Sequence, residues 1–138
     1  PWDVAGIISK VGDDNVWITE RGTSFGYNTL VNDFTGLQYM HENYRTPIIF
    51  DATHSVQLPG MAGDSSSGQR EYVETLALAA TTIGIAGIFI ESHPNPDSAP
   101  CDGPNMVPFK DLKSLITRIK NILKANLFIL VCEIKIKF

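Results

Sequence analysis

The chain has 138 residues, of which 43% are hydrophobic and 19% charged, and its net charge is −4. This length and balance are typical of one globular domain and exclude a disordered chain. The 11 Lys and Arg residues are outnumbered by 15 Asp and Glu residues, so we expect no nucleic-acid partner. The longest apolar stretch, residues 127–131, is far shorter than the roughly 20 residues of a membrane-spanning helix, so we expect no membrane partner.

The hydrophobic pattern and the turn residues predict alternating strands and helices. In chain order these are the end of a helix at 4–11, a strand at 15–20, a glycine-containing loop at 22–28, a helix at 33–41, a strand at 47–51, a long loop at 52–68, a helix at 69–83, a strand at 86–91, a polar loop at 92–108 and a helix at 110–125. Ser66 and Gln69 have the spacing of a capping box for the helix at 69–83.

The strand ends at Glu20, Asp51 and Glu91 are 31 and 40 residues apart, a natural length for βα units. A complete (β/α)₈ barrel needs about 250 residues. We therefore predict an α/β fold that forms the C-terminal part of such a barrel, about three βα units, with residues 1–126 as the partial domain. Residues 127–138 are expected to be an extraneous apolar tail, and the alternation of Ile and Lys after Glu133 is strand-like.

Charged and polar residues follow each of the three apolar strands. The apolar runs are almost continuous, which is typical of strands buried on both faces of a parallel sheet. The carboxyl ends of parallel strands meet at one edge, where active sites of α/β enzymes lie. The sequence therefore predicts an enzyme whose candidate residues lie along this edge.

Arg21 is the first candidate, because a guanidinium beside Gly22 at the end of a strand suits bidentate binding of phosphate or carboxylate. A structural pair between Arg21 and Glu20 is an equally good explanation. His54, Glu91 and Asp102 follow two successive strands, and such a trio binds a divalent metal or handles protons. Each of the three alone is weak evidence, because a single His is more often structural.

Three further residues receive only structural roles. His93 is followed by Pro94 and is expected to shape its loop, and Cys101 has no base near it in sequence. Cys101 and Cys132 are too few and too far apart for a disulfide framework or a zinc site, which favours the cytoplasm.

Four ordered motifs closely resemble the 3-deoxy-D-manno-octulosonate 8-phosphate (Kdo 8-phosphate) synthases. They are TERGTSFGYN at 19–28, FDATHSVQ at 50–57, FIESHPNP at 89–96 and CDGPN at 101–105. The resemblance spans roughly residues 3–125 and implies a cytoplasmic (β/α)₈ barrel, usually a homotetramer. It implies the condensation of phosphoenolpyruvate and D-arabinose 5-phosphate, with water, in the synthesis of the Kdo sugar of lipopolysaccharide.

The resemblance also implies roles for individual residues. Arg21 would hold the phosphate of phosphoenolpyruvate, and Gln57 and the loop to Arg70 would border the sugar-phosphate site. His54, Glu91 and Asp102 match positions that bind zinc, iron or manganese in the metal-dependent branch of the family. The CDGP run at 101–104 resembles the metal-independent branch, so we favour no metal, with the three residues forming a hydrogen-bonded network.

Several family positions are absent from this sequence: a first-strand metal ligand, a lysine that binds phosphoenolpyruvate and a loop that grips arabinose 5-phosphate. We therefore expect the isolated chain to be inactive. Two alternatives stay open. One is a sister synthase that joins phosphoenolpyruvate to another sugar phosphate, as in the shikimate pathway, although the run at 51–57 argues mildly against it. The other is a non-catalytic fragment.

Overall fold

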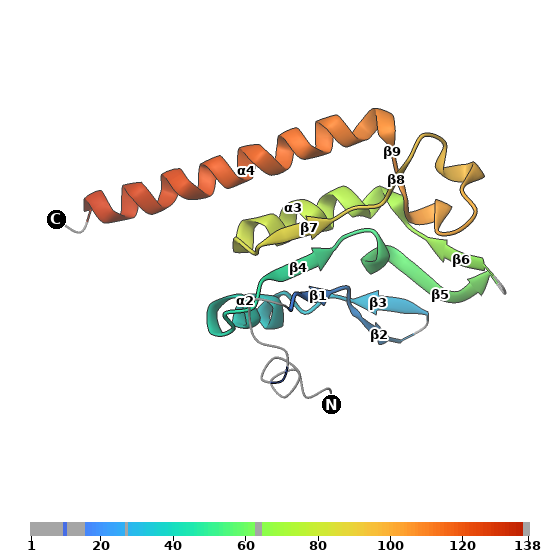
Figure 1. Ribbon diagram of the computed structural model, residues 1–138, viewed down its shortest axis with the longest axis horizontal. Helices are drawn as coiled ribbons and strands as arrows, with labels where there is room; N and C mark the ends of the chain where they lie inside the picture. Colours follow the sequence, from blue (N-terminus) through green and yellow to red (C-terminus); the bar gives the residue numbers. More distant parts are fainter. Residues whose placement is uncertain (1–9, 11–15, 27, 63–64, 137–138) are drawn as a thin grey trace.

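A three-stranded parallel sheet forms the centre of the molecule (Figure 1). The computed structural model describes residues 10, 16–26, 28–62 and 65–136. The sheet has the order β1 (Ile18–Glu20), β4 (Ile48–Asp51) and β7 (Gly87–Phe89). Ile18 pairs with Ile48, and Ile49 pairs with Gly87, so the three strands end at the same edge. The expected parallel order is confirmed.

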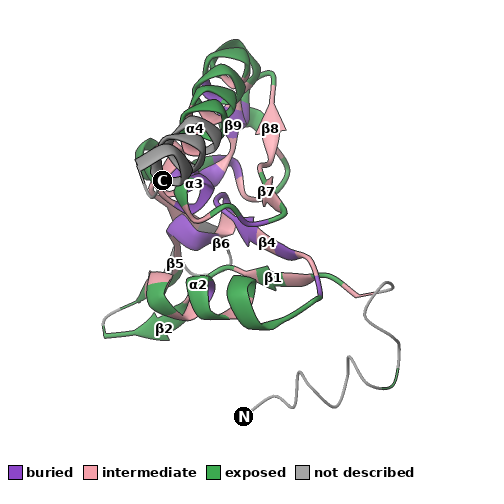
Figure 2. Cartoon of the chain, turned by 90° about the vertical axis from the view of Figure 1, so that its left-hand side faces the viewer, coloured by how far each residue is buried: buried purple, intermediate pink, exposed green. Residues whose placement is uncertain are grey.

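Only the central strand is buried on both faces (Figure 2). Phe50 and Asp51, which point to opposite faces of β4, are 0% and 6% exposed, whereas Phe89 of β7 is 43% exposed. Trp17, just before β1, is 71% exposed. The expectation that all three strands are buried on both faces is therefore wrong for β1 and β7. The physical reason is that each of these strands has a hydrogen-bonded neighbour on one side only in the described part of the chain.

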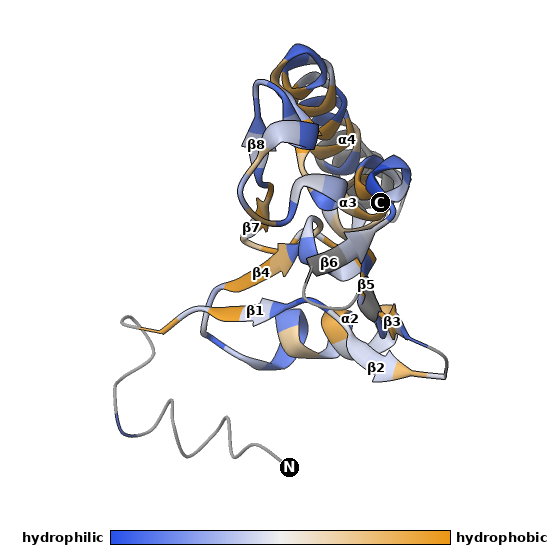
Figure 3. Ribbon diagram, turned by 90° about the vertical axis from the view of Figure 1, so that its right-hand side faces the viewer, coloured by the Kyte–Doolittle hydropathy of each residue, from blue (hydrophilic) through white to orange (hydrophobic). Residues whose placement is uncertain are grey.

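In the part of the chain from residue 16 onward that the structure describes, three α-helices accompany the strands: α2 (Phe34–Asn43), α3 (Val73–Ile83) and α4 (Phe109–Ile136). Helix α2 begins at the N-cap Asp33, whose Oδ1 accepts hydrogen bonds from the backbone of Thr35 and Gly36 at 3.0 Å each. Helix α3 ends at Gly84 in the left-handed region with φ 84°. The apolar faces of α2 and α3 meet the apolar strands in one core, which includes Leu37, Phe50, Val73, Ala77 and Leu115 (Figure 3).

Short elements occupy the loops beyond the sheet. Strands β2 (Thr23–Phe25) and β3 (Thr29–Val31) form one antiparallel pair, and β5 (Gln57–Ala62) and β6 (Ser65–Gly68) form another. The last loop contains β8 (Ser92–His93), β9 (Val107–Pro108) and the 3₁₀ turns η4 (Pro96–Ser98) and η5 (Gly103–Asn105). Two more 3₁₀ turns, η2 (His54–Val56) and η3 (Arg70–Tyr72), precede β5 and α3.

Two local expectations are wrong. Residues 66–69 do not form a capping box, because Ser66 lies in β6 and strand pairing extends to Gly68 opposite Gln57. Residues 133–136 are not a strand, because α4 continues past residue 126 to Ile136 and the i to i+4 hydrogen bonds of the helix replace the strand-like alternation. The helix end expected at 4–11 lies outside the described residues except for Lys10, which is helical. None of the described helices is long and apolar enough to cross a membrane.

Candidate active site

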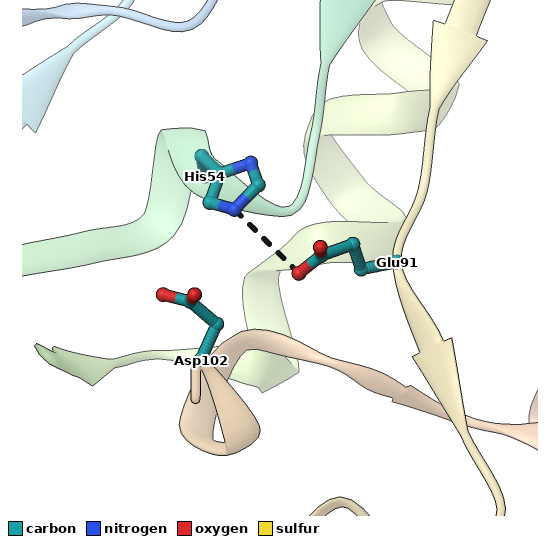
Figure 4. A group of neighbouring side chains, drawn as sticks. All are labelled: His54, Glu91 and Asp102. Carbon is teal, nitrogen blue, oxygen red and sulfur yellow. Dashed lines mark ion pairs between the residues drawn. The ribbon is translucent and has the colours of Figure 1, made fainter. Parts of the chain in front are cut away.

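The ends of the three parallel strands carry the predicted residues. Arg21 follows β1, His54 begins the turn η2 after β4, and Glu91 lies between β7 and β8. Asp102 reaches the same place from the loop between β8 and β9, as the N-cap residue of η5. Figure 4 shows the side chains of His54, Glu91 and Asp102 converging from these separate segments.

His54, Glu91 and Asp102 form a compact cluster. One ligand atom from each side chain lies within 4.8 Å of those of the other two. His54 Nε2 lies 3.5 Å from Glu91 Oε2, and the two form an ion pair when the imidazole is protonated (Figure 4). The side chains of His54 and Glu91 are 17% and 31% exposed, so the cluster is sheltered but reachable. The structure thus brings together the trio expected from the sequence.

A fourth residue, Asp51, orients the histidine and was missed as a site residue. Asp51 Oδ2 lies 2.7 Å from His54 Nδ1, and Asp51 Oδ1 accepts a hydrogen bond from the His54 backbone N–H at 2.9 Å. A carboxylate there favours the tautomer with a proton on Nδ1, so Nε2 is the ring nitrogen that faces Glu91. The sequence does contain a signal for this role, because Asp51 ends the predicted strand and His54 follows it three residues later.

The loop segments of the site are tied to one another through the backbone and by ring stacking. Thr53 is fully buried, and its Oγ1 accepts a hydrogen bond from the Glu91 N–H at 2.7 Å. The ring of Phe89 stacks on the imidazole of His54 with the ring centres 5.8 Å apart. These contacts join the end of β4 to the end of β7 and fix the distance between His54 and Glu91.

Arg21 joins the cluster through Gln57. The guanidinium Nη2 donates to Gln57 Oε1 at 2.7 Å, and Gln57 Nε2 donates to Asp102 Oδ1 at 2.6 Å. The alternative pairing of Arg21 with Glu20 is not seen among the described residues. Glu20 Oε1 instead accepts from the Gly22 N–H at 2.5 Å, where Gly22 has φ 91°. Arg21 therefore faces the site and keeps donors for an anion.

Cys101 is an exposed neighbour of the cluster. Its hydrogen bond with the Asp102 side chain, followed by desolvation and the nearby negative charges, raises the pKa of the Cys101 thiol. A thiol held in its neutral form is a poor nucleophile. His93, the other residue assigned a structural role, accepts the Asn95 N–H on its Nδ1 at 3.1 Å and so shapes its loop.

Arg70 lies apart from the cluster. Its Nη2 donates to Asp97 Oδ1 at 2.8 Å and to the Gly103 carbonyl at 2.7 Å. Arg70 also lines an open pocket of about 680 Å³ between the start of α3 and the start of α4, together with Glu74, Lys110 and Asp111. The structure therefore brings Arg21 and Gln57 to the trio, and connects Arg70 to the loop that carries Asp102.

The chemistry of the trio fits a divalent cation. Imidazole nitrogen and carboxylate oxygens are ligands that zinc, iron and manganese accept. Among the described residues, Glu91 Oε2 is buried and has no hydrogen-bond partner, so it is available to a ligand beside His54 Nε2. A third carboxylate, Asp51, supplies the outer hydrogen bond that metal-binding histidines usually make.

The similarity to known proteins extends over most of the chain. A protein-family model described as the DAHP synthetase I family matches residues 3–125. A relative from Bradyrhizobium diazoefficiens, named 2-dehydro-3-deoxyphosphooctonate aldolase, is 55% identical over 122 residues, which is 86% of this chain and 43% of that protein. A relative of the same name from Rhodopseudomonas palustris is 56% identical over 84% of this chain and 42% of its own length.

Solved structures show the same fold at lower identity. A truncated 3-deoxy-D-arabino-heptulosonate 7-phosphate synthase from Thermotoga maritima matches with a TM-score of 0.72 and 28% identity, over 88% of this chain and 43% of that chain. A DAHP synthase from the same organism matches with a TM-score of 0.69 and 27% identity, over 86% of this chain and 32% of that chain. The described α/β structure is thus part of a (β/α)₈ barrel.

The matched segment spans less than half the length of these curated relatives. The similarity nevertheless extends through every predicted site residue, since all of them lie between Arg21 and Asp102 and the family model covers 3–125. The chain belongs to the DAHP synthetase I family.

Proposed function

We propose that this chain is the part of a Kdo 8-phosphate synthase that supplies one wall of the active site. The reaction is the condensation of phosphoenolpyruvate with D-arabinose 5-phosphate and water, giving Kdo 8-phosphate and phosphate. The observation that carries the proposal is the identity of about 55% to relatives named 2-dehydro-3-deoxyphosphooctonate aldolase, which is about twice the identity to the heptulosonate synthases. We also propose that the complete protein is located in the cytoplasm and forms a homotetramer.

The chemistry requires groups that stabilise charge on a phosphate and on an aldehyde oxygen. Carbon 3 of phosphoenolpyruvate attacks the aldehyde carbon, water adds at carbon 2, and the tetrahedral product loses phosphate. Arg21 binds the phosphate through its exposed guanidinium nitrogens, and Gln57 orients that guanidinium at the border of the sugar phosphate. The positive charge stabilises the leaving phosphate as its negative charge grows.

Proton handling falls to the trio. Asp51 keeps His54 Nδ1 protonated, so Nε2 is the atom that accepts a proton from the attacking water or returns one to the aldehyde oxygen. Glu91 and Asp102 orient the water through their carboxylate oxygens. If a divalent ion is bound, His54, Glu91 and Asp102 would hold it, and it would supply Lewis-acid polarisation of an oxygen.

The proposal is tested by completing the barrel. Residues 3–125 of this chain are joined to the remaining segments of the Bradyrhizobium diazoefficiens relative, in place of the matching part of that protein. We expect this chimera to form the eight-carbon product from arabinose 5-phosphate much faster than the seven-carbon product from erythrose 4-phosphate. A preference for erythrose 4-phosphate would instead support the sister heptulosonate activity named in the two Thermotoga structures.

A further inference from the structure

Asp102 reaches the active site on a loop that has little regular structure. Residues 94–106 contain only the two 3₁₀ turns η4 and η5, and Asp102 itself has φ 51°, in the left-handed region. Strain of this kind persists only where surrounding contacts hold it. The position of the Asp102 carboxylate therefore depends on what fastens this loop to the rest of the molecule.

The two turns are packed tightly against each other. Gly103 is buried, and a Cβ on it would lie 2.3 Å from the carbonyl oxygen of Pro96, so no other residue fits there without displacing η4. The Asn105 N–H donates to the Asp102 carbonyl at 2.9 Å and closes η5. The two turns thus form one packed unit that holds Asp97, Asp102 and Gly103 in fixed relative positions.

Arg70 is the side chain that ties this unit to the start of α3. One nitrogen, Nη2, donates both to Asp97 on η4 and to the carbonyl of Gly103, the residue that directly follows Asp102. Both hydrogen-bond acceptors of Arg70 belong to the loop. Among the described residues, Arg70 has no partner that faces the substrate site. The Arg70 side chain is 30% exposed while Asp97 is 80% exposed, so the arginine is the inner member of the pair.

A second contact holds the same unit from the side of β6. Asn105 is fully buried, and a Cβ on Gly68 would lie 1.4 Å from Asn105 Oδ1. The backbone of Gly68 therefore lies directly against η5, two residues before Arg70. The segment 68–70 contacts η5 twice, once by this close approach and once by the guanidinium.

Resting on the proposed function, we infer that Arg70 is a positioning residue for Asp102 and does not touch the sugar phosphate. Its guanidinium fixes the loop 96–103 against the start of α3 and so sets where the Asp102 carboxylate lies relative to His54 and Glu91. Gln57 holds the Asp102 side chain directly, and Arg70 holds the backbone beside it. This role differs from the one that the family resemblance suggests for Arg70.

The test compares kcat with KM in the chimera described above. Arg70→Met keeps the apolar stem and removes both hydrogen bonds. We expect kcat to fall roughly tenfold to a hundredfold, as for displaced catalytic groups, while the KM for arabinose 5-phosphate stays within about twofold. Arg70→Lys restores part of kcat, because an ammonium can still donate to Asp97 or Gly103. Asp97→Asn lowers kcat in the same direction by less.

The matched control is Arg118→Met. Arg118 also pairs with a carboxylate, Glu74, but this pair joins α3 to α4, and no hydrogen bond joins Arg118 to the loop among the described residues. We expect its kcat to equal that of the parent. Hydrogen exchange gives a readout independent of turnover: the amides of Gly103, Asn105 and Met106 should exchange faster in Arg70→Met and not in Arg118→Met.

Two results would overturn the inference. A rise of about tenfold or more in the KM for arabinose 5-phosphate with unchanged kcat would show that Arg70 binds the substrate phosphate. Equal behaviour of Arg70→Met and Arg118→Met would show that the contact does not position Asp102. If the parent chimera uses erythrose 4-phosphate instead, the proposed function fails, and the same comparison made with that substrate still decides the role of Arg70.

Discussion

The two sides of the active site are built differently. The imidazole side consists of Asp51 and His54 at the end of the central strand β4, joined by local contacts between residues three apart, and of Glu91 after β7, whose N–H donates to the buried Thr53. The guanidinium side consists of Arg21, which follows the edge strand β1, and Gln57, which begins β5, and the described residues join the two by one hydrogen bond between positions 36 apart in sequence. Burial on both faces of β4 explains the difference, because it fixes the backbone from which His54 projects (Figure 2).

This contrast indicates that the imidazole side is preorganised by the fold of the described segment, whereas the guanidinium side is completed by its ligand. A carboxylate that is 6% exposed and bonded to both the ring and the backbone of His54 leaves the imidazole one orientation. Arg21 is exposed and has one neighbour that orients it. The predictions below test whether this distinction holds.

The largest expected effect is the complete absence of synthase activity in the isolated 138-residue chain. Even a preorganised imidazole side cannot act without the remaining strands, which supply the other substrate contacts in our proposal. The two outer strands of the sheet also leave apolar surface uncovered. Formation of Kdo 8-phosphate by the purified chain, measured by its chromatographic separation from both substrates, would contradict this expectation.

Arg21→Ala should have the next largest effect. In the chimera we expect kcat/KM for phosphoenolpyruvate to fall at least about a hundredfold, because alanine offers neither the charge nor the paired donors of a bidentate phosphate contact. Arg21→Lys should recover part of the loss, since it keeps the charge without the planar fork. Steady-state kinetics decide the question: full efficiency in Arg21→Ala would make the arginine a structural residue.

Asp51→Asn should lower kcat roughly tenfold to a hundredfold, the usual cost of removing a group that orients a catalytic histidine. The amide of Asn can donate toward Nδ1 and so favours the wrong tautomer of His54. Asp111→Asn, an exposed substitution at the start of α4, is the control and should leave kcat unchanged. An unchanged kcat in Asp51→Asn would mean that the stacking of Phe89 suffices to orient the ring.

Asp33→Ala should lower the melting temperature of the chain without changing either side of the site. The Thr35 side chain and the Gly36 N–H, both bonded to Asp33, hold the pKa of its carboxyl below the ordinary value. A lowered folded-state pKa means that the stabilisation is present above the unfolded pKa and is lost as pH falls through the folded pKa. The gap in melting temperature between parent and variant should therefore be full at neutral pH and close in acid. A gap that persists in strong acid would assign the effect to helix propensity.

Removal of metal should have the smallest effect. The CDGP run at 101–104 supports metal independence, so we expect the chimera to keep its rate after exhaustive chelation. The trio would then act as a hydrogen-bonded network on the preorganised imidazole side. Activity that disappears with chelator and returns with zinc, iron or manganese would show that the cluster is a metal site, which its ligand atoms also fit.

The sequence by itself determined the elements and the chemistry at their ends. Continuous apolar runs predicted the three parallel strands, and the polar residues after them predicted the edge where His54 and Glu91 meet. His54 and Glu91 follow the ends of adjacent parallel strands by three and two residues, which leaves them little freedom, so local pattern and topology suffice. The motif resemblance correctly identified the family.

Only the tertiary structure decided which partner each side chain takes. The role of Asp51 and the link from Arg21 through Gln57 to Asp102 depend on distances between segments, which spacing in sequence does not specify. The same holds for Arg70, whose position after a glycine-rich loop gave no hint that it would bond to Gly103 across 33 residues. The strand pairing at Gly68 and the helix that continues through residues 127–136 also depend on hydrogen bonds that compete with local propensity, and these competitions are settled only in the folded chain.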